Sequence, residues 1–391
     1  MPQGVPPLLE ALAAGRDDEV PERARSVPEA EWPNLLDTVR RHGLTPLLGH
    51  VLATHPRACP SEVRATLRSH EEHAMLWHRI RMSDLRRIIT AIEGAGIPHI
   101  LMKGAALGLM LYRSPWHRLG GDTDILVPAG RAREAHDLAK EAGFQVTEEW
   151  EDAHHLPALQ KGSNPPIEIH HESLYVPTPD PGYRLVPVDF QALDAEATSV
   201  DAGGFQARVP SSRDALLQLS CNFASHMEES IARPLRWVRD YAELLGPGGV
   251  GWSAVDERLR ELAPELTDTV LLSLALAQPF LAHLYDAELE ERLGQLPPGL
   301  SRLARHVSAR DMVYEWVTSP FRAWQVLSCL MGPFGATKWS LRKLVVSREH
   351  ISAQTGIPET ALSMRVYPVA FAIHAAYHVG RKDRSDAGSD G

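Results

Sequence analysis

The chain has 391 residues, of which 44% are hydrophobic and 23% are charged, with 40 Lys and Arg against 50 Asp and Glu. This composition excludes a mostly disordered chain, and at about 150 residues per domain the length indicates two or three domains. A net charge of −10 excludes strong non-specific binding of nucleic acid by the chain as a whole. The last 91 residues carry 12 basic and 7 acidic groups, however, and this positive segment would attract an anionic partner.

Membrane insertion and disulfide formation are not expected. The longest apolar stretch, 269–285, contains Gln278, Pro279 and His283, and it is shorter than the ~20 apolar residues that span a bilayer. The N-terminus lacks the basic and apolar pattern of a signal peptide, and the three cysteines lie far apart. The sequence therefore predicts a cytoplasmic protein that does not contact a membrane.

The N-terminal part is predicted to be helical. Apolar residues recur at intervals of three and four within 8–12, 35–39 and 76–92. We therefore expect an N-terminal helical segment over 1–94.

The pattern then changes to short apolar runs, which indicate strands separated by helices. A small α/β unit with a mixed sheet is expected within 95–209. Its last part, 177–209, is rich in Pro, Gly and Asp and is expected to be a connecting segment. The predicted strands are 97–102, 122–127, 144–150, 154–160 and 167–175, and the predicted helices are 105–113 and 131–142.

A second helical region follows the sheet. Residues 210–380 are expected to form a C-terminal helical domain, with a break at Gly246–Gly249, and 381–391 a disordered tail. The fold class is therefore α+β, with a small mixed-sheet core embedded between helical segments.

Two aspartates separated by one residue begin one of the predicted strands. Asp122 and Asp124 follow two glycines and precede the apolar run 125–127. Residues i and i+2 of a strand point to the same face, so these carboxylates would lie side by side. Neighbouring carboxylates raise each other's pKa unless a cation lies between them, and Mg²⁺ prefers oxygen ligands. An exposed acidic turn without a function is the alternative.

The residues around this motif favour the functional interpretation. An apolar run ends at Lys103-Gly104 before a predicted helix, whose N-terminus would offer free N–H groups to phosphate. In Ile-Glu-Ile-His at 167–170, alternation places Glu168 and His170 on one face. If that strand lies beside the aspartates, three carboxylates converge, as two-metal phosphoryl transfer requires.

Together these motifs resemble the nucleotidyltransferases of the DNA polymerase β superfamily, and in particular the uncharacterised nucleotidyltransferase group. The shared pattern is Lys103-Gly104 and a helix, then Tyr112, Arg118, the Asp-x-Asp strand, and the later Ile-Glu-Ile-His strand. The resemblance extends over most of the chain, since 221–245 is similar to that group's helix ending in Arg-Trp-x-x-Asp.

The resemblance implies a role for each acidic residue. Asp122 and Asp124 would bind Mg²⁺, for which Mn²⁺ can substitute, and through it the triphosphate of an NTP. Glu168 would be the third carboxylate, acting as a base or as a ligand of a second metal. Glu172 is the alternative candidate for this third carboxylate. Glu168 departs from the superfamily, which usually has Asp there.

The resemblance also implies contacts to the nucleotide. Gly104 and Ala105 occupy the Gly-Ser or Gly-Gly position that cradles phosphates, and Ala105 leaves only backbone N–H groups for that contact. Lys103 and Arg118 would steady the leaving pyrophosphate. Two residues of the later helix are further candidates to face the nucleotide: His226 and Arg236.

The expected function is metal-dependent transfer of a nucleoside monophosphate from an NTP to a hydroxyl acceptor, with release of pyrophosphate. The acceptor can be a small molecule, a peptide or protein, or an RNA end, and the sequence discloses neither it nor the base preference nor the oligomeric state. A non-catalytic protein that retains the fold is the alternative, and a Glu168 carboxylate more than ~8 Å from the aspartates would favour it. A kinase-like enzyme is disfavoured, because Asn is absent five residues after Asp122.

Other patterns are set aside. The histidines of 70–73 lack the spacing of a metalloprotease motif. The pairs at 154–155 and 170–171 are adjacent in sequence, so on a strand each pair supplies at most one zinc ligand. Arg236 and Asp240 lie four residues apart, and an ion pair on the helix surface is the alternative to a role at the nucleotide.

Overall fold

The computed structural model describes residues 5–118, 120–147, 154–177, 183–225, 234–307 and 313, all within one compact unit. The described residues form helices around a five-stranded mixed sheet and two small two-stranded sheets, so the predicted α+β class is confirmed. Most of the positive C-terminal segment, the predicted tail 381–391 and most of the helical prediction beyond 307 lie outside the described residues.

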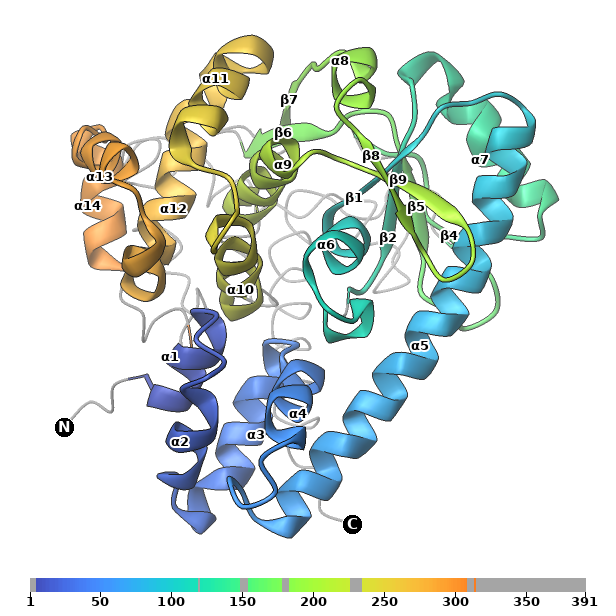
Figure 1. Ribbon diagram of the computed structural model, residues 1–391. Coiled ribbons are helices and arrows are strands. Elements are labelled where there is room, and N and C mark those ends of the chain that lie inside the picture. The colour runs from blue at the N-terminus through green and yellow to red at the C-terminus, as the bar shows by residue number, and fades with distance from the viewer. Residues whose placement is uncertain are drawn as a thin grey trace, which may run out of the picture. The chain divides into compact units, whose positions relative to one another are not determined.

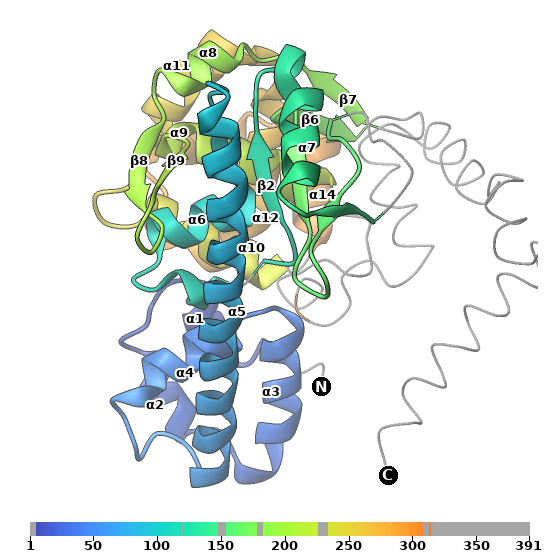
Figure 2. The same ribbon diagram turned by 90° about the vertical axis from the view of Figure 1, so that its right-hand side faces the viewer.

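The N-terminal part is helical throughout, as the apolar spacing predicts. Its last helix, α5, has 34 residues and is much longer than the others. Figure 2 shows α5 passing the N-terminal helices with one half and the sheet region with the other. The helices are α1 (Pro7–Ala13), α2 (Val20–Arg25), α3 (Trp32–Arg41), α4 (Thr45–Ala53) and α5 (Ser61–Gly94).

The central sheet has the strand order β1-β2-β5-β4-β3. Strand β2 is antiparallel to β1 and parallel to β5, so the two strands that carry the predicted carboxylates are direct neighbours. Helices α6 (Lys103–Leu111) and α7 (Ala132–Glu141) belong to the same region, beside the sheet in Figure 1. The strands are β1 (Ile100–Met102), β2 (Thr123–Leu126), β3 (Gln145–Val146), β4 (Leu159–Gln160) and β5 (Ile167–His170).

The alternation of apolar and polar residues gives this sheet two different faces. Ile125, Ile167 and Ile169 are fully buried in a hydrophobic cluster with the C-terminal half of α5 and with α7. Asp124 and Glu168 are each adjacent in sequence to at least one of these isoleucines, so their side chains point to the opposite face. Burial of the isoleucines fixes the orientation of both carboxylates, because a shift of the strand register by one residue would expose the isoleucines.

Several predicted strand limits were wrong. The run 167–175 is split into β5 and β6 (Leu174–Pro177), and β6 pairs with β7 (Tyr183–Val186) in a separate sheet. The split has a local cause, since the amides of residues 171 and 172 both donate to the carbonyl of His154 and end the regular ladder. The runs 144–150 and 154–160 contribute only the two-residue strands β3 and β4, and 148–153 lie outside the described residues.

The segment 183–209, which was expected to be a connecting segment, contains regular secondary structure. It contains β7, α8 (Phe190–Asp194) and a hairpin of β8 (Thr198–Asp201) and β9 (Gln206–Val209). The Asp201 carboxylate accepts hydrogen bonds from the amides of Gly203 and Gly204, both at positive φ, and so closes the hairpin turn. Pro- and Gly-rich composition marked these turns correctly but did not reveal the short strands between them.

The C-terminal helices begin at Ser212, and the predicted break at Gly246–Gly249 separates α10 from α11. Helix α12 holds the apolar stretch, and no helix in the described part of the chain is long and apolar enough to cross a membrane. The helices are α9 (Ser212–Ser225), α10 (Pro234–Leu245), α11 (Trp252–Leu262), α12 (Thr267–Leu281), α13 (Ala287–Gly294) and α14 (Pro298–His306).

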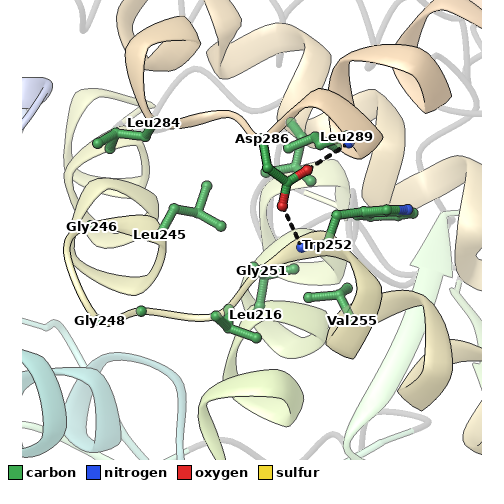
Figure 3. A pocket seen from close by; sticks show the side chains of 13 residues that line it. Leu216, Leu245, Gly246, Gly248, Gly251, Trp252, Val255, Leu284, Asp286 and Leu289 are labelled. Atoms are coloured by element: carbon green, nitrogen blue, oxygen red, sulfur yellow. Dashed lines mark hydrogen bonds between the residues drawn. The ribbon is translucent and has the colours of Figure 1, made fainter.

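A cavity of about 210 Å³ lies among these helices. Figure 3 shows the carboxylate of Asp286 at this cavity, where it accepts hydrogen bonds from the amides of Trp252 (3.0 Å) and Leu289 (2.7 Å). Both oxygens therefore satisfy backbone donors at the starts of α11 and α13. Leucine side chains form much of the remaining wall, so this cavity has the character of a packing feature.

Candidate active site

Strands β2 and β5 bring two of the predicted carboxylates together. In their parallel register Asp124 lies opposite Glu168, and Leu126 lies opposite His170. One ligand atom from each of Asp124, Glu168 and His170 lies within 4.8 Å of the others. This separation is well inside the ~8 Å limit set for metal sharing, and the donor set is two carboxylates and an imidazole.

Asp124, like His170, has no exposed surface. Its Oδ1 accepts hydrogen bonds from Lys103 Nζ and His170 Nε2, both at 2.8 Å. Burial alone would raise the pKa of this carboxyl, but Lys103 and His170 outweigh it and lower the pKa, so Asp124 is ionised. Its Oδ2 is buried without a hydrogen-bond partner among the described residues and remains available to a ligand.

Lys103 occupies an unusual backbone position. It is the only non-glycine residue of the described chain with positive φ, at 49°, where L-residues are disfavoured by about 1–2 kcal/mol. The residue directly links β1 to α6, and Met102 before it lies opposite Asp124 in the sheet. No side chain in the described part of the chain caps the start of α6. The strained turn thus places the Lys103 ammonium on Asp124 and leaves the N-terminal amides of α6 uncapped.

Position 104 has no room for a side chain, because a buried arginine lies against it. A Cβ on Gly104 would lie 2.8 Å from Arg118 Nη1, closer than real contacts allow. The Arg118 side chain is only 4% exposed, and its Nε and Nη2 donate to the fully buried Asp240 carboxylate at 3.1 and 2.7 Å. Tyr112 also donates its hydroxyl to Asp240, at 2.8 Å. A three-residue polar network therefore supports the start of α6 from behind.

Asp122 lies just outside β2 and is half-buried. The charge of Asp124 and burial raise its pKa, and Lys103 opposes them only in part. Arg81 of α5 donates to the Gly120 carbonyl in the same loop. Asp122 is thus electrostatically linked to Asp124, but it is not among the atoms that converge within 4.8 Å. A cation between the two aspartates would relieve the repulsion that raises this pKa.

Glu168 is partly exposed, at 19% of its side chain, and its Oε2 lies 3.3 Å from His170 Nε2. Burial opposes ionisation of Glu168, but the hydrogen bond from His170 prevails and lowers the pKa. The rings of His154, His155 and His170 contact one another in edge-on and tilted orientations, with centroids 4.7 to 5.3 Å apart. Burial lowers the pKa of His154 to about 2, so that ring is neutral.

The remaining predicted residues are placed as follows. Ala105 is buried in the first turn of α6, and Arg236 is half-buried on α10. Asp240 has no exposed surface and binds Arg118, so it does not form a surface pair on the helix. Glu172, the alternative third carboxylate, is half-buried with a pKa raised by burial and is not part of the converging group. His226 lies outside the described residues.

Two contributors to the site were missed by sequence reasoning. Arg81 is 9% exposed and falls on the apolar stripe of α5 that continues at Leu85, Ile88 and Ile92. A charged residue at a position that the 3.6-residue period assigns to the core is a signal for a buried polar contact. The pairing of Arg118 with Asp240 had no such signal, because 122 residues separate the partners.

Comparison with known proteins identifies the family of the chain. The family model described as "Uncharacterised nucleotidyltransferase" matches residues 28–282. The solution structure of the antibiotic-resistance factor ANT(2'')-Ia is similar at 15% sequence identity and a TM-score of 0.33, over 47% of this chain and 90% of that one. No curated protein matches the sequence. Because the family match spans more than half of the chain, the resemblance seen in the motifs is confirmed, and the chain belongs to the uncharacterised nucleotidyltransferase family.

Proposed function

We propose that the protein transfers a nucleoside monophosphate from an NTP to a hydroxyl group of an acceptor and releases pyrophosphate. The observation that carries this proposal is the pairing of Asp124 with Glu168 across β2 and β5, with ligand atoms within 4.8 Å. Asp122, one residue before β2, supplies the third carboxylate. Three acidic groups at two neighbouring strands, next to the N-terminus of α6, suit a substrate that contains phosphates and binds with metal ions.

The residues present fit Mg²⁺. Asp124 has a buried oxygen without a hydrogen-bond partner among the described residues, and a hard cation is a suitable ligand for it. Asp122 has a raised pKa that a cation would restore toward its usual range. We propose Asp122, Asp124 and Glu168 as the residues that hold Mg²⁺ or Mn²⁺. When bound, the ion would neutralise the triphosphate and stabilise charge that develops during transfer.

The start of α6 is the proposed phosphate site. Gly104 and Ala105 contribute amides from the first turn of a nine-residue helix whose N-terminus no side chain among the described residues caps. The helix dipole adds a favourable partial positive charge of about half a unit at this end. Lys103 supplies a full positive charge, which is held at Asp124 and is 16% exposed. The contact of Arg118 with pyrophosphate stays a prediction; we propose in addition that its guanidinium, buried against Asp240, supports Gly104.

Glu168 suits metal binding better than proton removal. Its hydrogen bond to His170 lowers its pKa, and a carboxylate with a lowered pKa is a weaker base. In the proposed reaction the acceptor oxygen forms a bond to the α-phosphorus and the α–β phosphoanhydride bond breaks. Pyrophosphate leaves with the bridging oxygen, and the acceptor proton passes to solvent. The side chains of this chain hold and align the two reactants, which is the larger part of catalysis in phosphoryl transfer.

The acceptor is proposed only by class, as a hydroxyl of a small molecule, of a peptide or protein, or of an RNA end. The decisive experiment incubates the protein with Mg²⁺ and each of the four NTPs, labelled at the α-phosphate, with and without a cell extract. Transfer of α-label to a discrete product, together with pyrophosphate release, supports nucleotidyl transfer. The same reactions with γ-labelled NTP distinguish it from a kinase, which would transfer the γ-label instead.

Matched variants test whether the carboxylate site carries out the transfer of the label. Asp124→Asn and Glu168→Gln should each abolish labelling while the far-ultraviolet circular dichroism stays that of the wild type. Glu134→Gln removes an exposed acid of α7 that pairs with Arg131, and it should label normally. Full labelling by Asp124→Asn would refute the assignment. Absence of labelling in every condition, with intact Mg²⁺–NTP binding, would favour the non-catalytic alternative.

A further inference from the structure

A second group of metal-ligating side chains lies outside the carboxylate site. It consists of His50 on α4, Glu71 on α5 and His117 on the short 3₁₀ turn at Pro115–His117. One ligand atom of each lies within 4.8 Å of the other two. Sequence spacing gives no sign of this group, because its members are 21 and 46 residues apart along the chain.

A ring nitrogen of each histidine lies close to one oxygen of Glu71. His117 Nε2 lies 3.2 Å and His50 Nδ1 lies 3.8 Å from the same oxygen, Glu71 Oε1. The two imidazole rings are 4.3 Å apart and tilted by 36°. Ligands at 2.0–2.1 Å around a tetrahedral zinc ion are separated by about 3.3 Å from one another. Only a small inward movement therefore separates the observed positions from those of a bound ion.

The surroundings leave room for a further ligand. His50 and His117 both line a cavity of about 470 Å³. Two acidic residues on the same cavity wall, Asp17 and Glu243, are held by Arg239, so they do not complete a fourth protein ligand. His50 is 36% exposed, which gives an ion a path from solvent, whereas His117 is only 2% exposed. Two imidazoles, one carboxylate and one open position form a ligand set that suits zinc and related transition metals.

We propose that His50, Glu71 and His117 form a site for a divalent transition-metal ion of the zinc class, with water at the open position. The ion joins α4 and α5 to the turn that immediately precedes Arg118. Arg118 in turn contacts Gly104 at the start of α6, so the metal fixes the loop behind the carboxylate site. The donor set separates the two sites chemically, since nitrogen ligands favour zinc and an oxygen-rich site favours Mg²⁺.

Cobalt(II) is the probe, because its visible ligand-field bands report four- or five-coordinate binding. Full-length protein is treated with a chelator, and Co²⁺ is then added in the presence of excess Mg²⁺. We expect one equivalent of Co²⁺ with these bands, displaced by Zn²⁺. His50→Ala and Glu71→Gln should each weaken binding by more than about 100-fold, since even the loss of a supporting residue costs 10–100-fold. Asp124→Asn should retain the bands.

His73→Ala is the matched control. His73 is an exposed histidine on the same helix whose Nδ1 bonds to the backbone of its own turn, so its loss should leave Co²⁺ binding unchanged. Zn²⁺ should also raise the Tm of the wild type and of Asp124→Asn, but not that of His50→Ala. Bands that are absent from the wild type, or that persist in both His50→Ala and Glu71→Gln, overturn the proposal. Loss of the bands in Asp124→Asn alone overturns it as well.

Discussion

Replacing Asp240 with Asn should destabilise the protein more than its conservative chemistry suggests. Asp240 has no exposed surface and its carboxylate holds the buried guanidinium of Arg118. Removal of one partner of a buried ion pair leaves the other charge uncompensated, which costs about 3–5 kcal/mol. Asn keeps the volume and still accepts the hydrogen bond of Tyr112, so we expect the lower end of this range. A loss of about 3 kcal/mol lowers the folding equilibrium constant by roughly a hundredfold.

Urea unfolding followed by tryptophan fluorescence measures the change, and a second buried pair supplies the control. Asp214 is 1% exposed and binds Arg258 at 2.7 and 3.1 Å, in the same side-on arrangement but away from the carboxylate site. Arg258 also pairs with Glu196 and Glu261, both at 3.2 Å, so Asp214→Asn should lose less stability than Asp240→Asn. Only Asp240→Asn should also weaken Mg²⁺–NTP binding, because only Arg118 braces Gly104. Unchanged stability in Asp240→Asn, or equal loss of nucleotide binding in both variants, would refute this reasoning.

Three further changes test other parts of the structure. Burial lowers the pKa of His99 to about 4 from about 6.5 in the unfolded chain, so between these values only the unfolded state takes up a proton. Stability should thus fall by about 3 kcal/mol as the pH drops from 6.5 to 4, and His99→Leu should remove that part of the slope in urea titrations; equal slopes in both proteins would contradict the pKa shift. Gly104→Ala forces a Cβ against Arg118 and should cost about 1–3 kcal/mol and lower Mg²⁺–NTP affinity, whereas Gly121→Ala, with nothing within 4 Å of its Cβ, should be neutral in both assays. Asp286→Ala removes two backbone caps, and thermal unfolding should reveal a loss of about 1–2 kcal/mol with nucleotide binding unaffected.

The local part of the site could be predicted because it depends on periodicity. Alternation alone placed Glu168 and His170 on one strand face, and the alternate apolar residues Ile167 and Ile169 are indeed in the core. The helix after Lys103 and the strand after Asp122 were also found, with limits that differ by one or two residues. These features follow from a few neighbouring residues, which a pattern in the sequence contains in full.

Contacts between distant segments were beyond such patterns. Nothing in the sequence near Arg118 indicated that it would be buried against a carboxylate of α10 and lie close to Gly104. The left-handed conformation of Lys103 was likewise not foreseen, because lysine has no preference for it. Tertiary context determines both, as it does the group formed by His50 and its partners on two other elements.

Helix α5 connects the N-terminal helices to the sheet, because it packs into the hydrophobic clusters of both. Its first half contributes Val63 and Leu67 to one hydrophobic cluster, and its second half contributes Leu85 and Ile88 to the other. Unfolding either half would expose apolar surface in the neighbouring cluster, so the two regions should exchange amide hydrogens in one cooperative unit rather than separately. A fragment that starts after Gly94 would lack one wall of the sheet's core, and the carboxylates of β2 and β5 would lose the packing that orients them.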